Sequence, residues 1–123
     1  MGASLVSGAI GRAQARPPNI VWMMLDDLGY GDPGCYGQKQ IQTPNIDRLA
    51  TQGTRFTDCY AGGPVCAPSR SVLMTGLHMG HTSVRTNART VPLRNEDVTV
   101  AQLLKGAGYT NGLFGKWGLG DAG

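Results

Sequence analysis

An almost continuous apolar segment, residues 19–25, stops abruptly at two adjacent aspartates, Asp26 and Asp27. Such a run is typical of a strand that is buried on both faces, as the strands of parallel sheets are. The glycines and proline at positions 29–34 then predict a loop. Two carboxylates at a strand end repel each other unless a positive charge lies between them. This feature therefore predicts a parallel sheet that presents a pair of acidic side chains.

Two further strands are predicted, at residues 55–60 and 109–115. Helical segments separate the three strands, and the stretch from 77 to 95 has no clear period and is expected to be an extended excursion. An alternation of strands and helices favours an α/β fold with a mainly parallel sheet flanked by helices.

Helix boundaries are marked by local signals. Thr43 and Pro44 provide a cap and a first residue for a helix that Gly53 is expected to end. A second helix is predicted over residues 67–75, with proline in its first turn and glycine after its end. Residues 99–102, Thr-Val-Ala-Gln, match a capping box and open a third helix that runs to residue 106 or 108.

Composition restricts the function classes. The formal net charge is +3, and the basic residues are scattered along the chain, whereas nucleic-acid binding needs a clustered basic face. No stretch approaches the length of a transmembrane helix. The three cysteines form no C-x-x-C pair and no zinc spacing. Residues 1–17 are expected to be a disordered arm or a weak leader, since Ala13-Gln14-Ala15 is similar to a cleavage site but no basic stretch precedes it.

Chemically active side chains fall where α/β sheets collect ligands, beyond strand ends and at helix starts. Asp26 and Asp27 are candidate ligands of a hard divalent cation, which prefers oxygen donors. Cys66 stands at a helix start, where the helix dipole stabilises negative charge. Arg70 lies one helical turn further on, and Lys116 follows the third predicted strand. Taken singly, each has a commoner explanation, such as a solvated turn, a buried thiol or a surface lysine.

Four segments carry motifs that occur together in one order. They are the apolar run with Asp26-Asp27, Thr43-Pro44-Asn45-Ile46-Asp47, Cys66-Ala67-Pro68-Ser69-Arg70 followed by Thr75-Gly76, and Gly115-Lys116-Trp117. Together, over residues 18–120, they resemble the type I, formylglycine-dependent sulfatase family and its arylsulfatase-like members. The resemblance implies an alkaline-phosphatase-like fold. It also implies that residues 18–123 are the amino-terminal, incomplete portion of a catalytic domain.

The resemblance implies that a formylglycine-generating enzyme converts Cys66 to an aldehyde before folding. One hydroxyl of the hydrated aldehyde then attacks the sulfur of a sulfate ester and expels the alcohol, and the other allows sulfate to leave. Asp26, Asp27 and the modified Cys66 would hold Ca²⁺, with Mg²⁺ as the alternative ion. Arg70 would hold the diol oxygen. Lys116 would bind a sulfate oxygen and stabilise the transition state. A secreted, periplasmic or lysosomal location is also implied.

The chain departs from the family pattern in two respects. Many members carry Lys-x-His where this sequence has Lys116-Trp117-Gly118, so the base for sulfate release is expected elsewhere. His78 or His81 could supply it, with His81 also a candidate substrate-binding side chain, and a surface loop with two solvated histidines is the alternative. Secondly, the family's further metal ligands lie far downstream, so weak or absent activity is expected of these 123 residues alone.

Two alternative functions remain open from the sequence. One is a phosphonate or phosphate ester hydrolase of the same superfamily, which shares the metal and oxyanion chemistry. The other is a truncated, non-catalytic fragment.

Overall fold

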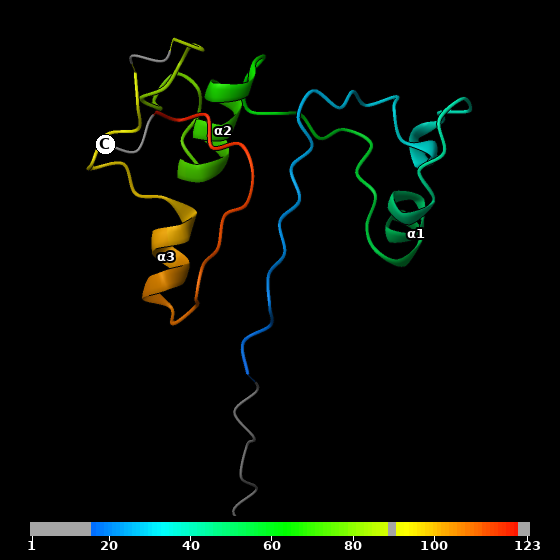
Figure 1. Ribbon diagram of the computed structural model, residues 1–123, viewed down its shortest axis with the longest axis horizontal. Helices are drawn as coiled ribbons and strands as arrows, with labels where there is room; N and C mark the ends of the chain where they lie inside the picture. The colour runs from blue at the N-terminus through cyan, green and yellow to red at the C-terminus, as the bar shows by residue number, and fades with distance from the viewer. Residues whose placement is uncertain (1–15, 89–90, 121–123) are drawn as a thin grey trace, which may run out of the picture.

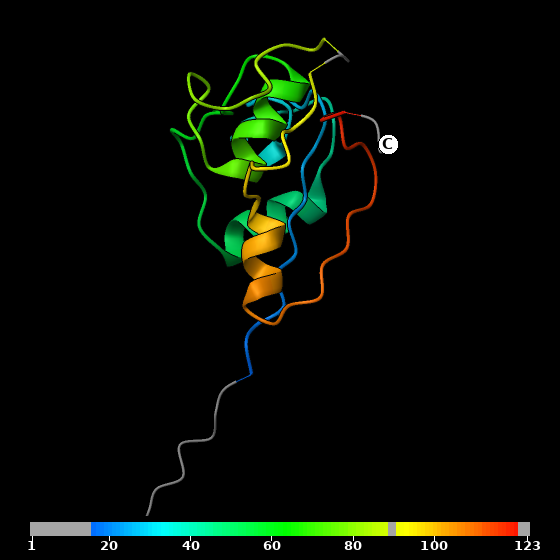
Figure 2. The ribbon, with the colours of Figure 1, turned by 90° about the vertical axis from the view of Figure 1, so that its left-hand side faces the viewer.

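The structure, a computed structural model, describes residues 16–88 and 91–120. These residues form a short 3₁₀ helix, η1 (Gly34–Tyr36), and three α-helices, α1 (Pro44–Gln52), α2 (Cys66–Thr75) and α3 (Val100–Gly106). η1 packs on α1, and α2 packs on α3. Both ribbon views place α2 above α3, with residues 19–25 running as an extended segment (Figures 1 and 2). The predicted arm, residues 1–17, lies outside the described residues except for its last two positions.

The predicted helices are confirmed, and the local signals explain their bounds. α2 begins one residue earlier than predicted, at Cys66. It ends at Thr75, and the next residue, Gly76, has a left-handed backbone with φ 68°. α3 has the complete capping box, in which Thr99 and Gln102 each accept a hydrogen bond from the other's backbone N–H. Gly53 does not adopt the predicted left-handed conformation, because the chain leaves α1 extended there, with φ −128°.

Thr43 precedes α1 as predicted, but its side chain does not cap the helix. Its hydroxyl instead accepts a hydrogen bond from the Gly34 N–H (2.7 Å) and donates one to Asp47 (3.0 Å). The Asp47 carboxylate also accepts from the Cys35 N–H (2.6 Å). A Cβ on Gly34 would lie 2.6 Å from an Asp47 oxygen, so a larger residue would have to displace the Asp47 carboxylate from these hydrogen bonds. These bonds join η1 to the first turn of α1.

The three predicted strands are not formed within the described residues. Residues 19–25, 55–60 and 109–115 contain no strand, residues 57, 58 and 115 lie in bends, and no backbone hydrogen bond in the described part of the chain joins any two of the three segments. Their apolar side chains are exposed, with 81% of Val21, 71% of Trp22 and 98% of Phe114 open to solvent. A strand needs hydrogen-bond partners on a neighbouring strand. The sheet predicted from the sequence is therefore absent from this structure because these segments lack such partners.

A small core surrounds α2. Ala67, Val84 and Leu119 are buried, and Met74, Leu93 and Trp117 pack against them. Ser71 and Thr82 are also buried and hydrogen-bond to each other through their hydroxyls, so neither polar group is left unpaired. The predicted excursion, described at residues 77–88 and 91–95, contains turns and no regular element. It supplies Thr82, Val84 and Leu93 to the core.

No helix in the described ranges is long and apolar enough to cross a membrane.

Candidate active site

The Asp26 side chain links its own segment to two others that are far from it in the sequence, those of Arg70 and Lys116. One of its carboxylate oxygens lies 3.1 Å from the Arg70 guanidinium on α2, and the other lies 2.8 Å from Lys116 Nζ. Arg70 also donates a hydrogen bond to the Lys116 carbonyl oxygen (2.6 Å). Each residue of this triad therefore contacts the other two. The predicted positive charge beside the acidic pair is present, and it comes from two side chains.

These contacts keep the triad charged at neutral pH. The hydrogen bond from Lys116, followed by that from Arg70, lowers the pKa of Asp26 below its ordinary value. The hydrogen bond to Asp26 raises the pKa of Lys116, and the nearby Cys66 adds to that rise. Asp26 therefore remains an anion, and Lys116 remains a cation close to residue 66.

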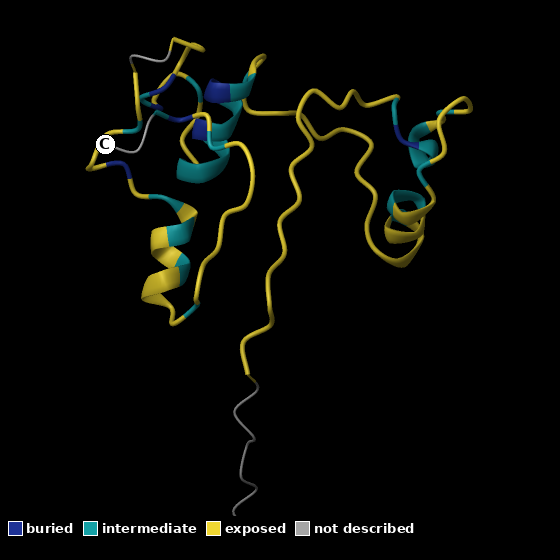
Figure 3. Ribbon diagram, viewed as in Figure 1, coloured by how far each residue is buried: buried dark blue, intermediate teal, exposed yellow. Residues whose placement is uncertain are grey.

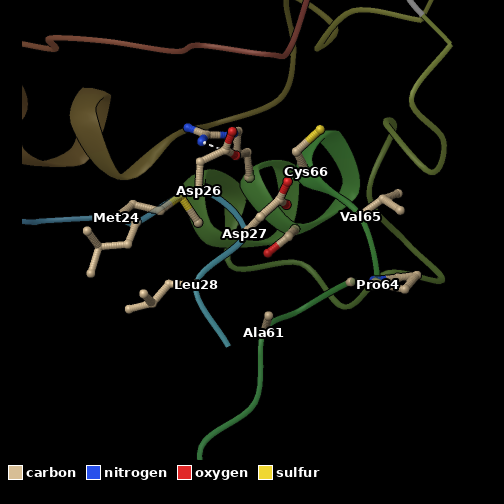
Figure 4. A pocket seen from close by; sticks show the side chains of 12 residues that line it. Met24, Asp26, Asp27, Leu28, Ala61, Pro64, Val65 and Cys66 are labelled. Atoms are coloured by element: carbon tan, nitrogen blue, oxygen red, sulfur yellow. Dashed lines mark hydrogen bonds and ion pairs between the residues drawn. The ribbon is translucent and has the colours of Figure 1, made fainter. Parts of the chain in front are cut away.

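Cys66, Arg70 and both aspartates line one open cavity of about 240 Å³, together with Ser69. Figure 4 shows Asp26 and Asp27 facing the start of α2, where Cys66 lies, with a dashed line marking the ion pair of Asp26. The sequence predicted that Asp26, Asp27, Cys66, Arg70 and Lys116 would meet. The structure brings four of them to one cavity and ties Lys116 to that cavity through Asp26.

Asp27 has an unusual backbone conformation, with φ 59° in the left-handed region. Such a conformation is costly for most residues, although the short polar side chain of aspartate tolerates it. In a regular strand, consecutive side chains point to opposite faces. The left-handed residue breaks that alternation, so two consecutive carboxylates can line the same cavity.

Cys66 is the first residue of α2, and Val65 before it supplies no side-chain cap. The cap comes from a distant residue, Asn87, whose Oδ1 accepts a hydrogen bond from the Ala67 N–H (3.0 Å) and one from the Cys66 thiol (3.4 Å). The sequence did not point to Asn87. The contact links residues 20 positions apart, across the rest of α2 and the irregular chain that follows it, and no local pattern indicates such a link.

His81, the candidate substrate-binding side chain, lies in an exposed turn and is not among the residues that line the cavity. Its backbone N–H donates to the His78 carbonyl oxygen (2.7 Å), and the two imidazole centroids are 6.3 Å apart. Both histidines are exposed, and neither lines the cavity.

Gly118, which stands where many sulfatases have histidine, has a left-handed backbone with φ 72°. A Cβ built on it would lie 3.2 Å from the Arg70 side-chain Cδ. A larger residue would therefore strain the backbone and press on the guanidinium arm that holds Asp26. This close approach gives a physical reason for glycine after Trp117.

Oxygen donors suit a hard cation such as Ca²⁺, and the two aspartates fit part of its coordination shell. Both oxygens of Asp26 already contact cationic side chains, but a carboxylate oxygen has more than one acceptor direction and can serve two partners. No group of three or more His, Cys, Asp or Glu side chains suited to a metal occurs in residues 16–88 and 91–120. The described residues therefore offer a partial shell.

Comparison with known proteins gives a consistent family. The Sulfatase family model matches residues 18–121. The chain is 49% identical to human arylsulfatase A over 120 residues, covering 94% of this chain and 24% of that protein. It is 46% identical to human steryl-sulfatase, covering 86% and 20%, and 39% identical to rat N-acetylgalactosamine-6-sulfatase, covering 92% and 24%.

A solved sulfatase structure, from work on the metabolism of multiple glycosaminoglycans by Bacteroides thetaiotaomicron, superposes with a TM-score of 0.76 at 42% identity. The match covers 86% of this chain and 23% of that one. The chain thus spans about a quarter or less of the length of the relatives it matches. With a family match over nearly all of its residues, the chain belongs to the sulfatase family.

Proposed function

We propose that this chain forms part of a sulfuric ester hydrolase of the arylsulfatase type, with residue 66 as the nucleophile. The observation that carries the proposal is the triad of Asp26, Arg70 and Lys116 beside Cys66. Two cations and a helix start lie next to a candidate nucleophile, which suits attack on an anionic group with several oxygens, such as a sulfate ester.

The nucleophile requires modification. A formylglycine-generating enzyme converts Cys66 to an aldehyde, whose hydrate supplies covalent catalysis with a built-in release of sulfate. The protein's own residues then have separate tasks. Arg70 holds the diol oxygen of residue 66 and Lys116 binds an oxygen of the sulfate group, while Asp26 holds both cations in place through its two oxygens. Lys116 remains protonated because Asp26 raises its pKa, so it can offset charge that develops as the ester bond breaks.

Asp26 and Asp27 would also hold a Ca²⁺ ion, with Mg²⁺ as the alternative. A divalent cation there would supply Lewis-acid polarisation of the sulfate group. Two carboxylates and an oxygen of residue 66 make only part of a shell of about six to eight ligands. We therefore propose that the 123 residues alone hydrolyse sulfate esters weakly or not at all.

The alkaline-phosphatase-like sheet is part of this proposal. Residues 19–25, 55–60 and 109–115 would become strands of a mainly parallel sheet when further strands pair with them. Support comes from their exposed apolar side chains and from the structural likeness to a solved sulfatase. The phosphonate or phosphate ester alternative gains no support, because the relatives named above are sulfatases.

The test is an assay of an aryl sulfate and a matched aryl phosphonate. It uses the longest polypeptide encoded with this sequence, co-expressed with the formylglycine-generating enzyme. We expect sulfate hydrolysis to exceed phosphonate hydrolysis, and Cys66→Ala to reduce it by at least about 1000-fold. Cys59→Ala is the matched control, because Cys59 is exposed and does not line the cavity, and it should leave activity unchanged. Preference for the phosphonate, or full activity of Cys66→Ala, would overturn the proposal.

A further inference from the structure

Asn87 contacts the candidate nucleophile from outside the family motifs. Its Oδ1 is 3.4 Å from Cys66 Sγ and 3.0 Å from the Ala67 nitrogen. A backbone N–H can only donate, so the side-chain oxygen of Asn87, and not its NH₂ group, must face α2. One oxygen therefore serves two groups at once, a backbone N–H in the first turn of the helix and the reactive side chain beside it.

The segment that bears Asn87 is anchored to the core. Val84 and Thr82 are 1% and 0% exposed, and Thr82 hydrogen-bonds to Ser71 on the inner face of α2. The Arg85 Nε–H donates to the Thr82 carbonyl oxygen (3.0 Å) and closes the turn that leads to Asn87. α2 and the segment 82–87 thus pack in the same core, and Asn87 links the end of that segment to the first turn of α2. Such an arrangement fixes the side-chain oxygen relative to residue 66.

We propose that Asn87 is a positioning residue, which orients the side chain of residue 66 and holds the first turn of α2. The thiol is only a weak donor to the Asn87 oxygen. Conversion of Cys66 replaces sulfur with hydroxyl oxygen, which is a stronger donor, so the modified residue would be held more firmly. This part of the inference rests on the proposed function, whereas the contact with the unmodified thiol does not.

The contact can be tested on the unmodified chain, expressed without the converting enzyme. Iodoacetamide alkylates Cys66 and Cys59, which share the tryptic peptide 56–70, so fragmentation of one peptide gives the ratio of the two rates. Asn87→Ala removes the acceptor, and we expect Cys66 to react about two- to fivefold faster relative to Cys59. Asn87→Asp keeps an acceptor but adds a negative charge, which opposes the thiolate, so Cys66 should react more slowly than in the wild type.

The opposite signs distinguish positioning from loss of structure, because unfolding would change both variants in the same direction. Hydrogen exchange at the Ala67 amide should accelerate in Asn87→Ala and stay near the wild-type rate in Asn87→Asp, which preserves the cap. Asn95→Ala is the matched control, because Asn95 is an exposed asparagine in the same irregular stretch, and it should change neither quantity. An unchanged Cys66 to Cys59 ratio in both Asn87 variants would overturn the proposal.

Activity provides the second readout, in the longest encoded polypeptide with residue 66 converted. Asn87→Ala should lower kcat by about 10- to 100-fold with KM nearly unchanged, as expected for a residue that orients the reacting group. A rise in KM alone would overturn the positioning role. A wild-type protein that hydrolyses no sulfate ester would overturn the proposed function instead, and the alkylation ratios would still decide the contact of Asn87.

Discussion

Two regions of the chain differ sharply in how they are held together. The α2 region, residues 64–97 with 116–120, contains the buried residues Ala67, Val84 and Leu119 and the buried hydroxyl pair of Ser71 and Thr82, apart from the two positions that are not described. In the leading region, residues 16–63, α1 buries no residue at all. Figure 3 shows most of the dark buried positions around α2, whereas the leading region is mostly exposed and has a buried position at Pro33, just before η1.

The candidate site therefore has two parts: a packed part on the α2 region, and a docked part that is held to it mainly by ion pairs. Cys66, Arg70 and Asn87 lie on or against the packed α2 region. Asp26 and Asp27 arrive on an extended segment that is joined to α2 by the ion pairs of Asp26, whose side chain is 43% exposed. Exposed ion pairs contribute little free energy and are screened by salt. The metal-binding half of the site should therefore loosen before the nucleophile half does.

The largest effect is expected from removing matched leucines in the two regions. Leu119→Ala deletes a side chain that is 2% exposed and should lower the free energy of unfolding by about 3 kcal/mol. Leu49→Ala removes a side chain that is 53% exposed and should change it by less than about 0.5 kcal/mol. Urea denaturation followed by circular dichroism measures both. Equal losses would contradict the contrast between the regions.

Acid should weaken the α2 region through Asp97. The Asp97 carboxylate accepts hydrogen bonds from Arg94 and Ser83, which lower its pKa from 3.8 to about 2. A carboxyl group whose pKa is lower in the folded than in the unfolded state stabilises the fold at pH values above its unfolded-state pKa. For Asp97 this stabilisation is about 2 kcal/mol, and it is lost as the pH falls toward 2. Asp97→Asn should remove this dependence between pH 4 and pH 2 in urea titrations. Asp58→Asn, in the exposed leading region, should leave it intact, and loss of the dependence in that control would contradict the assignment.

Glycine substitutions in the two regions should also differ in their effect on the free energy of unfolding, by a smaller amount. Gly118→Ala places a Cβ at a left-handed position against Arg70, and should cost about 1–2 kcal/mol of unfolding free energy. In the leading region, a Cβ on Gly31 meets nothing within 4 Å, so Gly31→Ala should be nearly neutral. Thermal denaturation compares the two. A neutral Gly118→Ala would show that the Lys116 segment does not pack on Arg70 as described.

Added salt should have the smallest effect, and we expect it only in the amide hydrogen exchange of the segment that carries Asp26. Raising the ionic strength from about 0.05 M to 0.5 M screens the exposed pairs of Asp26. Amide hydrogen exchange at residues 19–27 should then accelerate, while the amides of α2 keep their rates. Asp26→Asn at low salt should reproduce the change. Equal acceleration in both segments would contradict the separation into packed and docked parts.

The helices could be predicted because their signals are local. The capping box of Thr99 and Gln102, the glycine at 76 and the proline at 44 act within one turn of the residues they control. The strands could not be confirmed in the same way, since a strand depends on hydrogen-bond partners elsewhere in a polypeptide. The apolar run 19–25 has the composition of a buried strand, yet its side chains lie exposed.

In the candidate site, too, residues marked by local motifs could be predicted, whereas residues that depend on distant contacts could not. Asp26, Cys66, Arg70 and Lys116 could be singled out from their places beside predicted elements and from the family motifs, and the structure brings them together. The spacing of residues gave no sign of Asn87, because its contact crosses an irregular loop. Nor did it explain Gly118, whose role depends on a positive φ and the approach of Arg70.

The identity of residue 66 tests the account most directly. The chain is co-expressed with the formylglycine-generating enzyme, and the tryptic peptide 56–70 is then examined by mass spectrometry, with Cys59 in the same peptide as the unmodified internal control. In the proposed mechanism the enzyme converts Cys66 before folding, so the 123-residue chain should be a sufficient substrate. The account predicts an aldehyde at residue 66, which a hydrazide reagent captures, and a thiol at residue 59. A thiol at residue 66, in a host that modifies a control sulfatase, would contradict it.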